Sequence, residues 1–412
     1  MRAVVVAQVF PPEPVVSSRT SFDVAQGLAA RGHDVTVLAP FPSRPAGRLY
    51  AGYTRALFRS EESGGFRLIR CFSTLSKTSS LMSRFAENLS FGITSSLRLM
   101  VLRKPDALYV NTWPVFAAAL TMGVARLRRI PAIVSVQDVY PESLIAQGRT
   151  SPAGAVSSLL RAVDRFIVSK ASAVILISRQ FAAHYASTRG LAGDVMRVVP
   201  NWLPHEGTDE VSGAAAAVRA RHGVPANAFL IAYGGNVGAA AGLETVIEAF
   251  RDPELDSRIH LLVAGSGTSL ENCRRLAAQV APGRIFFQPE WHGSMDVLHA
   301  ADAVILPTRG AQSVASVPSK LVSYLFASRP VIAMAVEGSA TAEMIRDSGC
   351  GIVIAPDDSR ALVSSANAVA AMPPEERRQM GERGREWSLR NVTRQVCLPP
   401  LLDLIETVGG AG

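Results

Sequence analysis

The chain has 412 residues, of which 48% are apolar and 18% charged, so it can bury large cores and is neither disordered nor fibrous. Its length predicts two domains, and its formal net charge of +8 favours an anionic partner. Cys71, Cys273, Cys350 and Cys397 lie far apart without a CxxC pair, which argues against a disulfide scaffold or a zinc ribbon. No DxD or HExxH motif is present to hold a catalytic metal ion.

Short apolar runs alternate with helix-length segments along the first half of the chain. The first run, residues 3–9, is too short for a signal-peptide core and indicates a buried strand. Residues 113–125 form the longest nearly uncharged segment, but arginines follow it before the ~20 residues that a bilayer requires. We predict strands over residues 3–9, 34–38, 66–71, 107–110, 132–136, 173–177 and 196–199. We predict helices over residues 18–31, 83–102, 152–171 and 179–188.

The same alternation resumes after residues 200–207, where two prolines, a glycine and the lack of periodicity indicate a linker. Uninterrupted Val, Ile and Leu runs are typical of strands buried on both faces of a parallel sheet, and their spacing indicates right-handed βαβ units. The sequence therefore predicts an α/β protein of two Rossmann-like, doubly wound parallel-sheet domains that face a ligand-binding cleft. Strands of the second domain are predicted over residues 229–233, 260–264, 284–287, 303–306, 330–333 and 351–354.

Glycines follow the first predicted strand of the second domain and precede a helix predicted near residues 243–250. Glycines at such a place let the backbone approach a phosphate group closely, although a tight turn without a ligand would need them too. A second turn at residues 265–267 matches only part of GxGxxG, so a dinucleotide site is a weak interpretation. The candidate phosphate-binding residues of the first turn are Gly235, Asn236, Val237 and Gly238.

A lysine stands near the start of the helix that we predict after Pro318. Pro318 and Ser319 suit the cap and first turn of that helix. Lys320 then lies in the first turn, where a positive charge opposes the helix dipole, so a bound diphosphate would explain its presence. The alternative is an exposed lysine without a ligand.

Two carboxylates follow the fifth predicted strand of the first domain. Asp138 and Glu142 lie beyond its carboxyl end on the side of the predicted cleft, where either can act as a base or bind hydroxyl groups. The alternative role of Asp138 is to cap a helix. In the loop after the first strand, Arg19 is a candidate phosphate contact, and the simpler role of Ser17 or Ser18 is to cap the next helix.

Residues 44–129 carry fourteen lysines and arginines against four acidic residues, and this net charge of +10 exceeds that of the whole chain. Leucines, phenylalanines and methionines lie between the cations, which suits a surface that faces anionic lipid headgroups. The alternative is an ordinary solvated face over buried core positions. Nucleic acid is disfavoured as a partner because no recognition motif is present.

Taken in order, several segments resemble the retaining glycosyltransferases of family four, which have the GT-B fold. The likeness covers nearly the whole chain and is nearest to the colanic-acid and O-antigen fucosyl- or N-acetylfucosaminyl-transferases. The matching segments are residues 11–14 (PPEP), 137–143 (QDVYPES), 199–202 (VPNW), 235–238 (GNVG), 318–320 (PSK), 329–333 (RPVIA), 350–353 (CGIV) and 356–358 (PDD).

The resemblance implies a role for each part of the chain. Residues 1–204 would bind the acceptor, residues 205–388 would bind the nucleotide-sugar, and a helix within residues 389–412 would cross back to the first domain. In such enzymes Asp138 is the residue that we expect to be catalytic, and Arg19 and Glu142 are those that we expect to bind the acceptor.

The sequence departs from the family pattern in the second domain. Many relatives carry Arg and Lys after the glycines, but residues 239–241 are alanines here, which leaves the diphosphate to Lys320. The family's paired glutamates would fall near Ala315 and Ser323, so Glu343 becomes the candidate for the ribose contact. In the first domain, Val15 and Val16 stand where relatives usually have glycines.

We therefore predict transfer of a sugar from a nucleotide diphosphate-sugar to a glycan or polyprenyl-diphosphate-linked acceptor, with retention at the anomeric carbon and without a metal ion or other cofactor. The process would be exopolysaccharide or O-antigen synthesis. Such acceptors place the enzyme in the cytoplasm, bound peripherally to the anionic inner face of the cytoplasmic membrane. The alternatives are a sugar-nucleotide epimerase of the same fold and a two-lobed solute-binding protein, for which an export signal would be expected.

Overall fold

The protein divides into two compact units. Unit 1 comprises Met1–Asn201 together with Gln395–Gly412, and unit 2 comprises Trp202–Arg394. Within the described part of the chain, no helix is long and apolar enough to span a bilayer. The computed structural model describes residues 1–14, 16–44, 46–76, 80–111, 115–203, 211, 213–291, 294–310 and 320–410.

The sheet of unit 1 has eight strands in the order β3-β4-β2-β1-β5-β6-β7-β8. All neighbouring strands are parallel except β3 and β4, which form an antiparallel hairpin at one edge. The strands are β1 (Arg2–Ala7), β2 (Asp34–Pro40), β3 (Phe58–Ser63), β4 (Phe66–Cys71), β5 (Ala107–Asn111), β6 (Ala132–Val136), β7 (Ala173–Leu176) and β8 (Met196–Val198).

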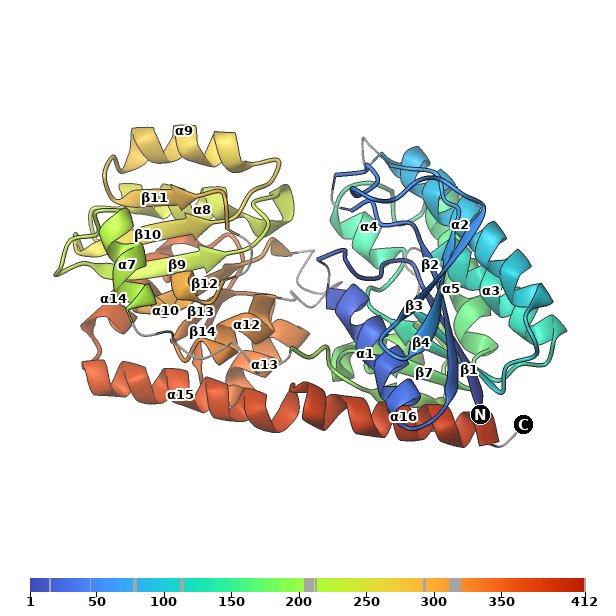
Figure 1. Ribbon diagram of the computed structural model, residues 1–412. Coiled ribbons are helices and arrows are strands. Elements are labelled where there is room, and N and C mark those ends of the chain that lie inside the picture. The colour runs from blue at the N-terminus through green and yellow to red at the C-terminus, as the bar shows by residue number, and fades with distance from the viewer. Residues whose placement is uncertain are drawn as a thin grey trace. The chain divides into compact units, whose positions relative to one another are not determined.

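Helices cover this sheet on its two faces. Helix α2 packs on α3, and α3 packs on α5, so these three form one layer (Figure 1). Residues 115–125 of the low-charge segment considered above belong to α3, whose Ala117, Ala118 and Met122 are buried in unit 1, and residues 113 and 114 lie outside the described residues. The helices are α1 (Val16–Ala30), α2 (Leu81–Val101), α3 (Val115–Leu127), α4 (Glu142–Ala146), α5 (Ala155–Ser169), α6 (Arg179–Arg189), the short η1 (Gly193–Val195) and α16 (Arg394–Gly410).

Unit 2 has six parallel strands in the order β11-β10-β9-β12-β13-β14. The direction of the winding reverses between β9 and β12, and open α/β sheets bind ligands beyond the carboxyl ends of the strands at such a point. The strands are β9 (Phe229–Gly234), β10 (Ile259–Ala264), β11 (Ile285–Gln288), β12 (Ala303–Pro307), β13 (Val331–Met334) and β14 (Gly351–Ile354).

Successive residues of the central strands enter two different cores of unit 2. Ile231 and Tyr233 of β9 pack into one apolar cluster, whereas Leu230 and Ala232 pack into the other. This explains why the sequence of β9 is apolar without alternation, since both faces of the sheet are covered. The helices of unit 2 are α7 (Ala214–Arg221), η2 (Ala239–Ala241), α8 (Leu243–Glu248), η3 (Ala249–Arg251), α9 (Leu270–Val280), α10 (Asp296–His299), α12 (Lys320–Phe326), α13 (Ala340–Ser348), α14 (Ser359–Ala371) and α15 (Pro374–Asn391).

The last helix packs on α1, at the side of unit 1 seen at the bottom right of Figure 1. Arg31 donates to the carboxylates of Asp403 at 2.6 Å and Glu406 at 2.9 Å. An added Cβ on Gly27 of α1 would lie 2.8 Å from Leu402, so the two helices approach closely. Helix α16 is thus an integral part of unit 1.

In unit 1 the sequence analysis missed one strand, and its interpretation of two serines is wrong. Strand β3 was not predicted, because its sequence FRSEES is polar and it lies at the edge of the sheet, where burial imposes little pattern. Ser17 and Ser18 do not cap α1, because the helix already begins at Val16 and both serines lie inside its first turn. The boundary between the units, at Asn201 and Trp202, falls within the predicted linker, of which residues 204–207 lie outside the described chain.

Candidate functional site

Two glycine turns pack against each other at the carboxyl ends of β9 and β10. Gly235 and Gly265 have φ angles of +154° and +121°, which favour glycine. A Cβ added to Gly265 would lie 2.0 Å from the carbonyl oxygen of Gly235, so only hydrogen fits there. The Gly235 amide donates to Ala264 at 2.9 Å, and the Val237 amide donates to Ser266 at 2.9 Å. The partial GxGxxG match thus has a packing role.

Lys320 lies directly over the first of these turns. Its ammonium donates to the Tyr233 hydroxyl and stands 4.3 Å from the centroid of that ring. The Cε and Nζ atoms are both 2.9 Å from the position that a Cβ on Gly235 would occupy, so the lysine also requires this glycine. Burial lowers the pKa of Lys320 to about 8.

The Lys320 ammonium has no carboxylate partner among the described residues, although most buried cations are paired. Lys320 lies beside the turn after β9 and is the first residue of α12, and the sheet reverses its winding between β9 and β12. A half-buried cation at this point, without a carboxylate partner among the described residues, is suited to bind an anionic ligand such as a diphosphate.

Two tyrosines that were not singled out in the sequence complete this cluster. The Tyr324 hydroxyl accepts from the Gly234 amide at 2.8 Å and donates to the Gly234 carbonyl at 3.1 Å, which fixes the end of β9. The Tyr233 hydroxyl donates to the Asn236 carbonyl at 2.6 Å and so fixes the turn. Tyr324 lies four residues after Lys320, one helical turn away on the same face, and that spacing was the available signal.

Arg309 was also missed. It follows β12 and its amide donates to the Ala240 carbonyl at 3.4 Å, while its guanidinium lies 3.5 Å from the Glu244 carboxylate. The side chain is half-exposed. A cation from a neighbouring strand therefore lies against residues 239–241, where the sequence itself has only alanines.

The other predicted donor-binding residues have different environments. Asn236 is exposed, whereas the Val237 side chain is fully buried in the core, so only the backbone of Val237 is available to a ligand. Glu343 lies half-buried in the first turn of α13, and no hydrogen bond or ion pair links it to Lys320 in the described part of the chain. Gly238 precedes η2, and Ser319 lies outside the described residues.

Asp138 stands beyond β6 in unit 1. Burial raises the pKa of its carboxyl group from 3.8 to about 7. It borders a small cavity of about 30 Å³ together with Gln137 and Tyr140. Capping is not its role, since the residue at the cap of α4 is Pro141 and no side chain caps that helix. A carboxyl group with a pKa near neutrality can exchange a proton with a substrate hydroxyl.

Glu142 belongs to an ion-pair network. Its carboxylate lies 2.9 Å from Arg189 and 3.4 Å from His184, and Arg189 also contacts Asp164 at 2.8 Å. Burial raises the pKa of Glu142, but the hydrogen bonds from His184 and Arg189 outweigh it and bring the pKa to about 2. Glu142 therefore stays ionised and is unsuited to act as a base, which leaves hydroxyl binding as its remaining predicted role.

Arg19 lies in the first turns of α1 with a half-exposed side chain, 3.2 Å from the Asp23 carboxylate. The preceding loop is held by Glu13, whose buried carboxylate accepts from the amides of Ser43 and Arg44, both at 2.9 Å. The glutamate of the PPEP segment thus links the two loops at the carboxyl ends of β1 and β2.

Comparison with known proteins decides the family. Residues 17–202 match the model of the glycosyl transferase 4-like domain, and residues 215–387 match that of the glycosyl transferases group 1. The chain is a glycosyltransferase. It is 25% identical to the putative colanic acid biosynthesis glycosyl transferase WcaI of Escherichia coli (strain K12), over 94% of this chain and 96% of that protein.

Solved structures share the fold of this glycosyltransferase. Sucrose-phosphate synthase from Thermosynechococcus elongatus superposes with a TM-score of 0.76 at 18% identity, covering all of both chains. WaaG, a glycosyltransferase involved in lipopolysaccharide biosynthesis, superposes with a TM-score of 0.71 at 16% identity, covering 98% of this chain and 99% of that one. HepE from Anabaena in complex with UDP superposes with a TM-score of 0.72 at 13% identity, covering 99% of this chain and 100% of that one. The predicted GT-B fold and the family resemblance are confirmed, and neither an epimerase nor a solute-binding protein is favoured.

Proposed function

We propose that this glycosyltransferase moves a hexosyl group from a nucleotide diphosphate-sugar bound by unit 2 to a glycan or lipid-linked acceptor bound by unit 1. Two comparisons support the proposal: WcaI is described as a colanic acid biosynthesis enzyme, and HepE was solved with UDP. The acceptor would then belong to exopolysaccharide or O-antigen synthesis in the cytoplasm.

The observation that carries the donor site is the half-buried Lys320 ammonium, which has no carboxylate partner in the described part of the chain. A diphosphate beside the Gly235 turn would neutralise it, and Arg309 would supply a second positive charge in place of the alanines at 239–241. Two cations at the leaving group stabilise the charge that develops on it. We therefore propose that transfer needs no divalent metal ion.

In the proposed reaction, the bond between the anomeric carbon and the diphosphate oxygen breaks while a bond to the acceptor oxygen forms. The electron pair of the broken bond stays on the diphosphate, beside Lys320. The proton of the acceptor hydroxyl passes to the Asp138 carboxylate, whose pKa of about 7 suits this exchange. Retention means that the new bond forms on the face from which the diphosphate leaves.

The test begins with a panel of UDP-, GDP- and dTDP-sugars, each followed by thermal unfolding. A ligand at about 100 times its Kd stabilises the protein by about 2.7 kcal/mol. We expect one nucleotide class to stabilise the protein, donor hydrolysis to continue in EDTA, and the product to keep the anomeric configuration by NMR. The proposed donor site is wrong if no nucleotide stabilises the protein, and the metal-free step is wrong if Mn²⁺ is required.

We also propose peripheral binding to an anionic membrane through the ends of α2 and α3. Val101 and Leu127 are each 71% exposed there, beside exposed basic side chains. Arg98 and Arg128 of the basic stretch have internal roles instead: Arg128 donates to the carbonyl of Leu102 at 2.9 Å, and Arg98 lies over the Phe58 ring. The cations that remain for lipid headgroups are Arg103, Lys104, Arg126 and Arg129.

A further inference from the structure

Asp138 lies on a short segment of unit 1 that runs from the end of β6, at Val136, to the start of α4, at Glu142. No hydrogen bond joins the Asp138 carboxyl group to another of the residues that the structure describes, and burial is the cause of its raised pKa. The position of this carboxyl group therefore depends on what holds the backbone of its own segment.

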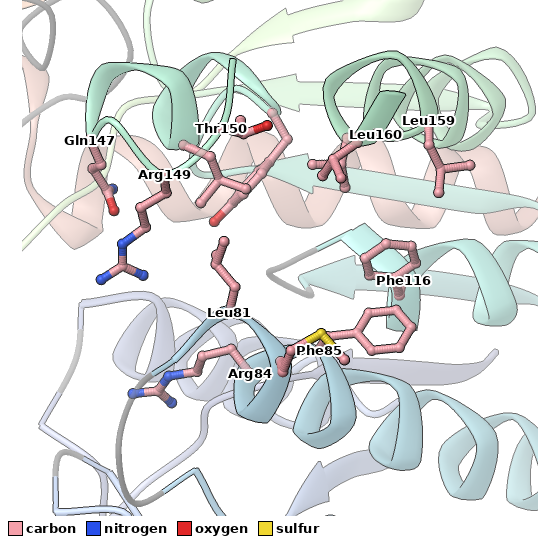
Figure 2. A pocket seen from close by; sticks show the side chains of 13 residues that line it. Leu81, Arg84, Phe85, Phe116, Gln147, Arg149, Thr150, Leu159 and Leu160 are labelled. Carbon is pink, nitrogen blue, oxygen red and sulfur yellow. The ribbon is translucent and has the colours of Figure 1, made fainter. Parts of the chain in front are cut away.

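Two hollows border this segment. Tyr140 lines an apolar groove of about 590 Å³ and also the cavity of about 30 Å³ that Asp138 borders. Figure 2 shows the groove, with Leu81 and Phe85 of α2 on one side and Leu160 of α5 on the other. Atoms that border a hollow have fewer packing partners on that side. Directional polar contacts therefore become more important for holding the segment in place.

Arg189 supplies such contacts. It is the last residue of α6, and its side chain is only 2% exposed. Its guanidinium donates to the Tyr140 carbonyl at 2.6 Å and to the Glu142 carboxylate at 2.9 Å, two and four residues after Asp138. Its Nε atom donates to Asp164 of α5 at 2.8 Å. The planar guanidinium fork can reach several acceptors at once, which the single ammonium of a lysine cannot do in the same geometry.

The anchor of Arg189 on α5 is itself held in place. The Tyr185 hydroxyl donates to the other oxygen of the Asp164 carboxylate at 3.1 Å. The Arg189 guanidinium lies over the Tyr185 ring, 5.6 Å from its centroid. Both Asp164 and Tyr185 also border the cavity at Asp138. A continuous set of contacts therefore joins α5 and α6 to the segment that carries Asp138.

We propose that Arg189 is a positioning residue for the transfer reaction: it joins Asp164 to the segment between β6 and α4 and so holds Asp138 where its carboxyl group meets the acceptor hydroxyl. The proposal rests on the proposed function, in which Asp138 receives the proton of that hydroxyl. Two of the acceptors of Arg189 belong to the segment that carries Asp138, which is more than the packing of α5 on α6 requires.

The first test follows the titration of Asp138 in the full chain by NMR of isotope-labelled aspartate carboxyl carbons, assigned with Asp138→Asn. We expect a pKa of about 7 in the wild type and a fall to about 6 or lower in Arg189→Lys, because the loosened segment lets water reach the carboxylate. The lysine keeps the positive charge, so a change of charge does not explain the fall. The other ionisable groups that border the cavity, Tyr140, Asp164 and Tyr185, are unchanged.

Two further variants complete this test. Arg179→Lys is the matched control, since Arg179 is exposed at the other end of α6, and the Asp138 titration should stay that of the wild type. Glu142→Asp keeps its charge but shortens the side chain that meets Arg189, so the pKa of Asp138 should fall by less. The proposal is overturned if Arg189→Lys leaves this pKa unchanged or, where that variant does not fold, if Glu142→Asp leaves it unchanged.

The second test measures release of the nucleoside diphosphate from UDP-, GDP- and dTDP-glucose with water as the acceptor. Arg189→Lys should lower the rate at saturating donor about tenfold to a hundredfold, since misplacement of a reacting group by about 1 Å has an effect of this size, and UDP affinity should be unchanged. In Asp138→Asn no carboxylate remains to be positioned, so Arg189→Lys should lower the residual rate no further. Equal losses in both backgrounds would make Arg189 a structural residue and overturn the proposal.

The two tests separate this proposal from the one on which it rests. A wild-type rate in Asp138→Asn would overturn the proposed proton transfer, and with it the role of Arg189 in the reaction. A low rate in Asp138→Asn together with an unchanged titration in Arg189→Lys would overturn the role of Arg189 alone.

Discussion

The Asp138 carboxyl group lies where burial disfavours its ionised form. Its pKa of about 7 exceeds its ordinary value of 3.8 because of burial, so the folded protein holds a proton between these pH values that the unfolded chain has lost. The free energy of unfolding therefore falls as the pH rises from about 4 to about 7, and the destabilisation is complete above this window. We propose that the reaction uses Asp138 in its ionised form.

Replacing Asp138 by Asn should separate stability from activity. The neutral amide avoids burying a charge, so the variant should be more stable than the wild type at pH 8 and about equally stable at pH 4. Its transfer rate should fall at least tenfold while nucleotide affinity is unchanged. Denaturant unfolding at both pH values and calorimetry with UDP check this. If Asp138→Asn lost stability at pH 8, the carboxylate would have a structural partner instead.

Lys320 should control the affinity for the nucleotide. A lost charge-assisted contact costs about 1.5–3 kcal/mol, so Lys320→Met should weaken UDP binding about tenfold to a hundredfold. Because the pKa of the free lysine is about 8, wild-type affinity should fall as the pH rises from 7 to 9. The variant should lack this dependence, whereas Lys170→Met, an exposed lysine of unit 1, should behave like the wild type. Equal calorimetric affinities of Lys320→Met and the wild type would contradict the assignment.

At the scale of elements, the two turns after β9 and β10 form one structure, because Gly265 fits against Gly235 only without a side chain. Gly265→Ala should lower the stability of unit 2 through overpacking of about 1–3 kcal/mol in addition to backbone strain of about 1–2 kcal/mol. Gly283→Ala has a φ of +81° but no atom within 4 Å of the new Cβ, so it isolates the strain. Denaturant unfolding and UDP binding are measured for both variants, and we expect Gly265→Ala to lower stability more than Gly283→Ala. Equal losses of stability in the two variants would show that the contact between the turns is unimportant.

The helices and strands could be predicted from the sequence wherever burial imposes a pattern of apolar residues. Strands β4, β6 and β14 begin and end at the predicted residues, and each contains two consecutive β-branched or leucine side chains. The polar edge strand β3 carried no such pattern. In the site, Lys320 and the glycines could be found from their order along the chain. Arg309 could not, because its approach to residues 239–241 depends on β12 lying beside β9.

At the scale of the whole molecule, the cations Arg103, Lys104, Arg126 and Arg129 should bind the protein to anionic vesicles. Each contributes about 1 kcal/mol near such a surface, and salt screens the attraction. Replacing all four by Gln should abolish sedimentation with anionic vesicles at low salt. The matched control replaces four exposed arginines of unit 2, Arg275, Arg360, Arg378 and Arg390. Equal sedimentation of both variants, or equal binding of the wild type to neutral and anionic vesicles, would show that this region is an ordinary solvated surface.

The division of unit 1 between two distant stretches of chain has a consequence for how the protein is made. The ribosome completes residues 202–394 before it adds α16, so unit 2 has all its strands while unit 1 still lacks a helix. Until then, the surface of α1 around Gly27 and Arg31 has neither the leucines nor the carboxylates that cover it in the finished protein. The unit that begins synthesis first is therefore the last to close.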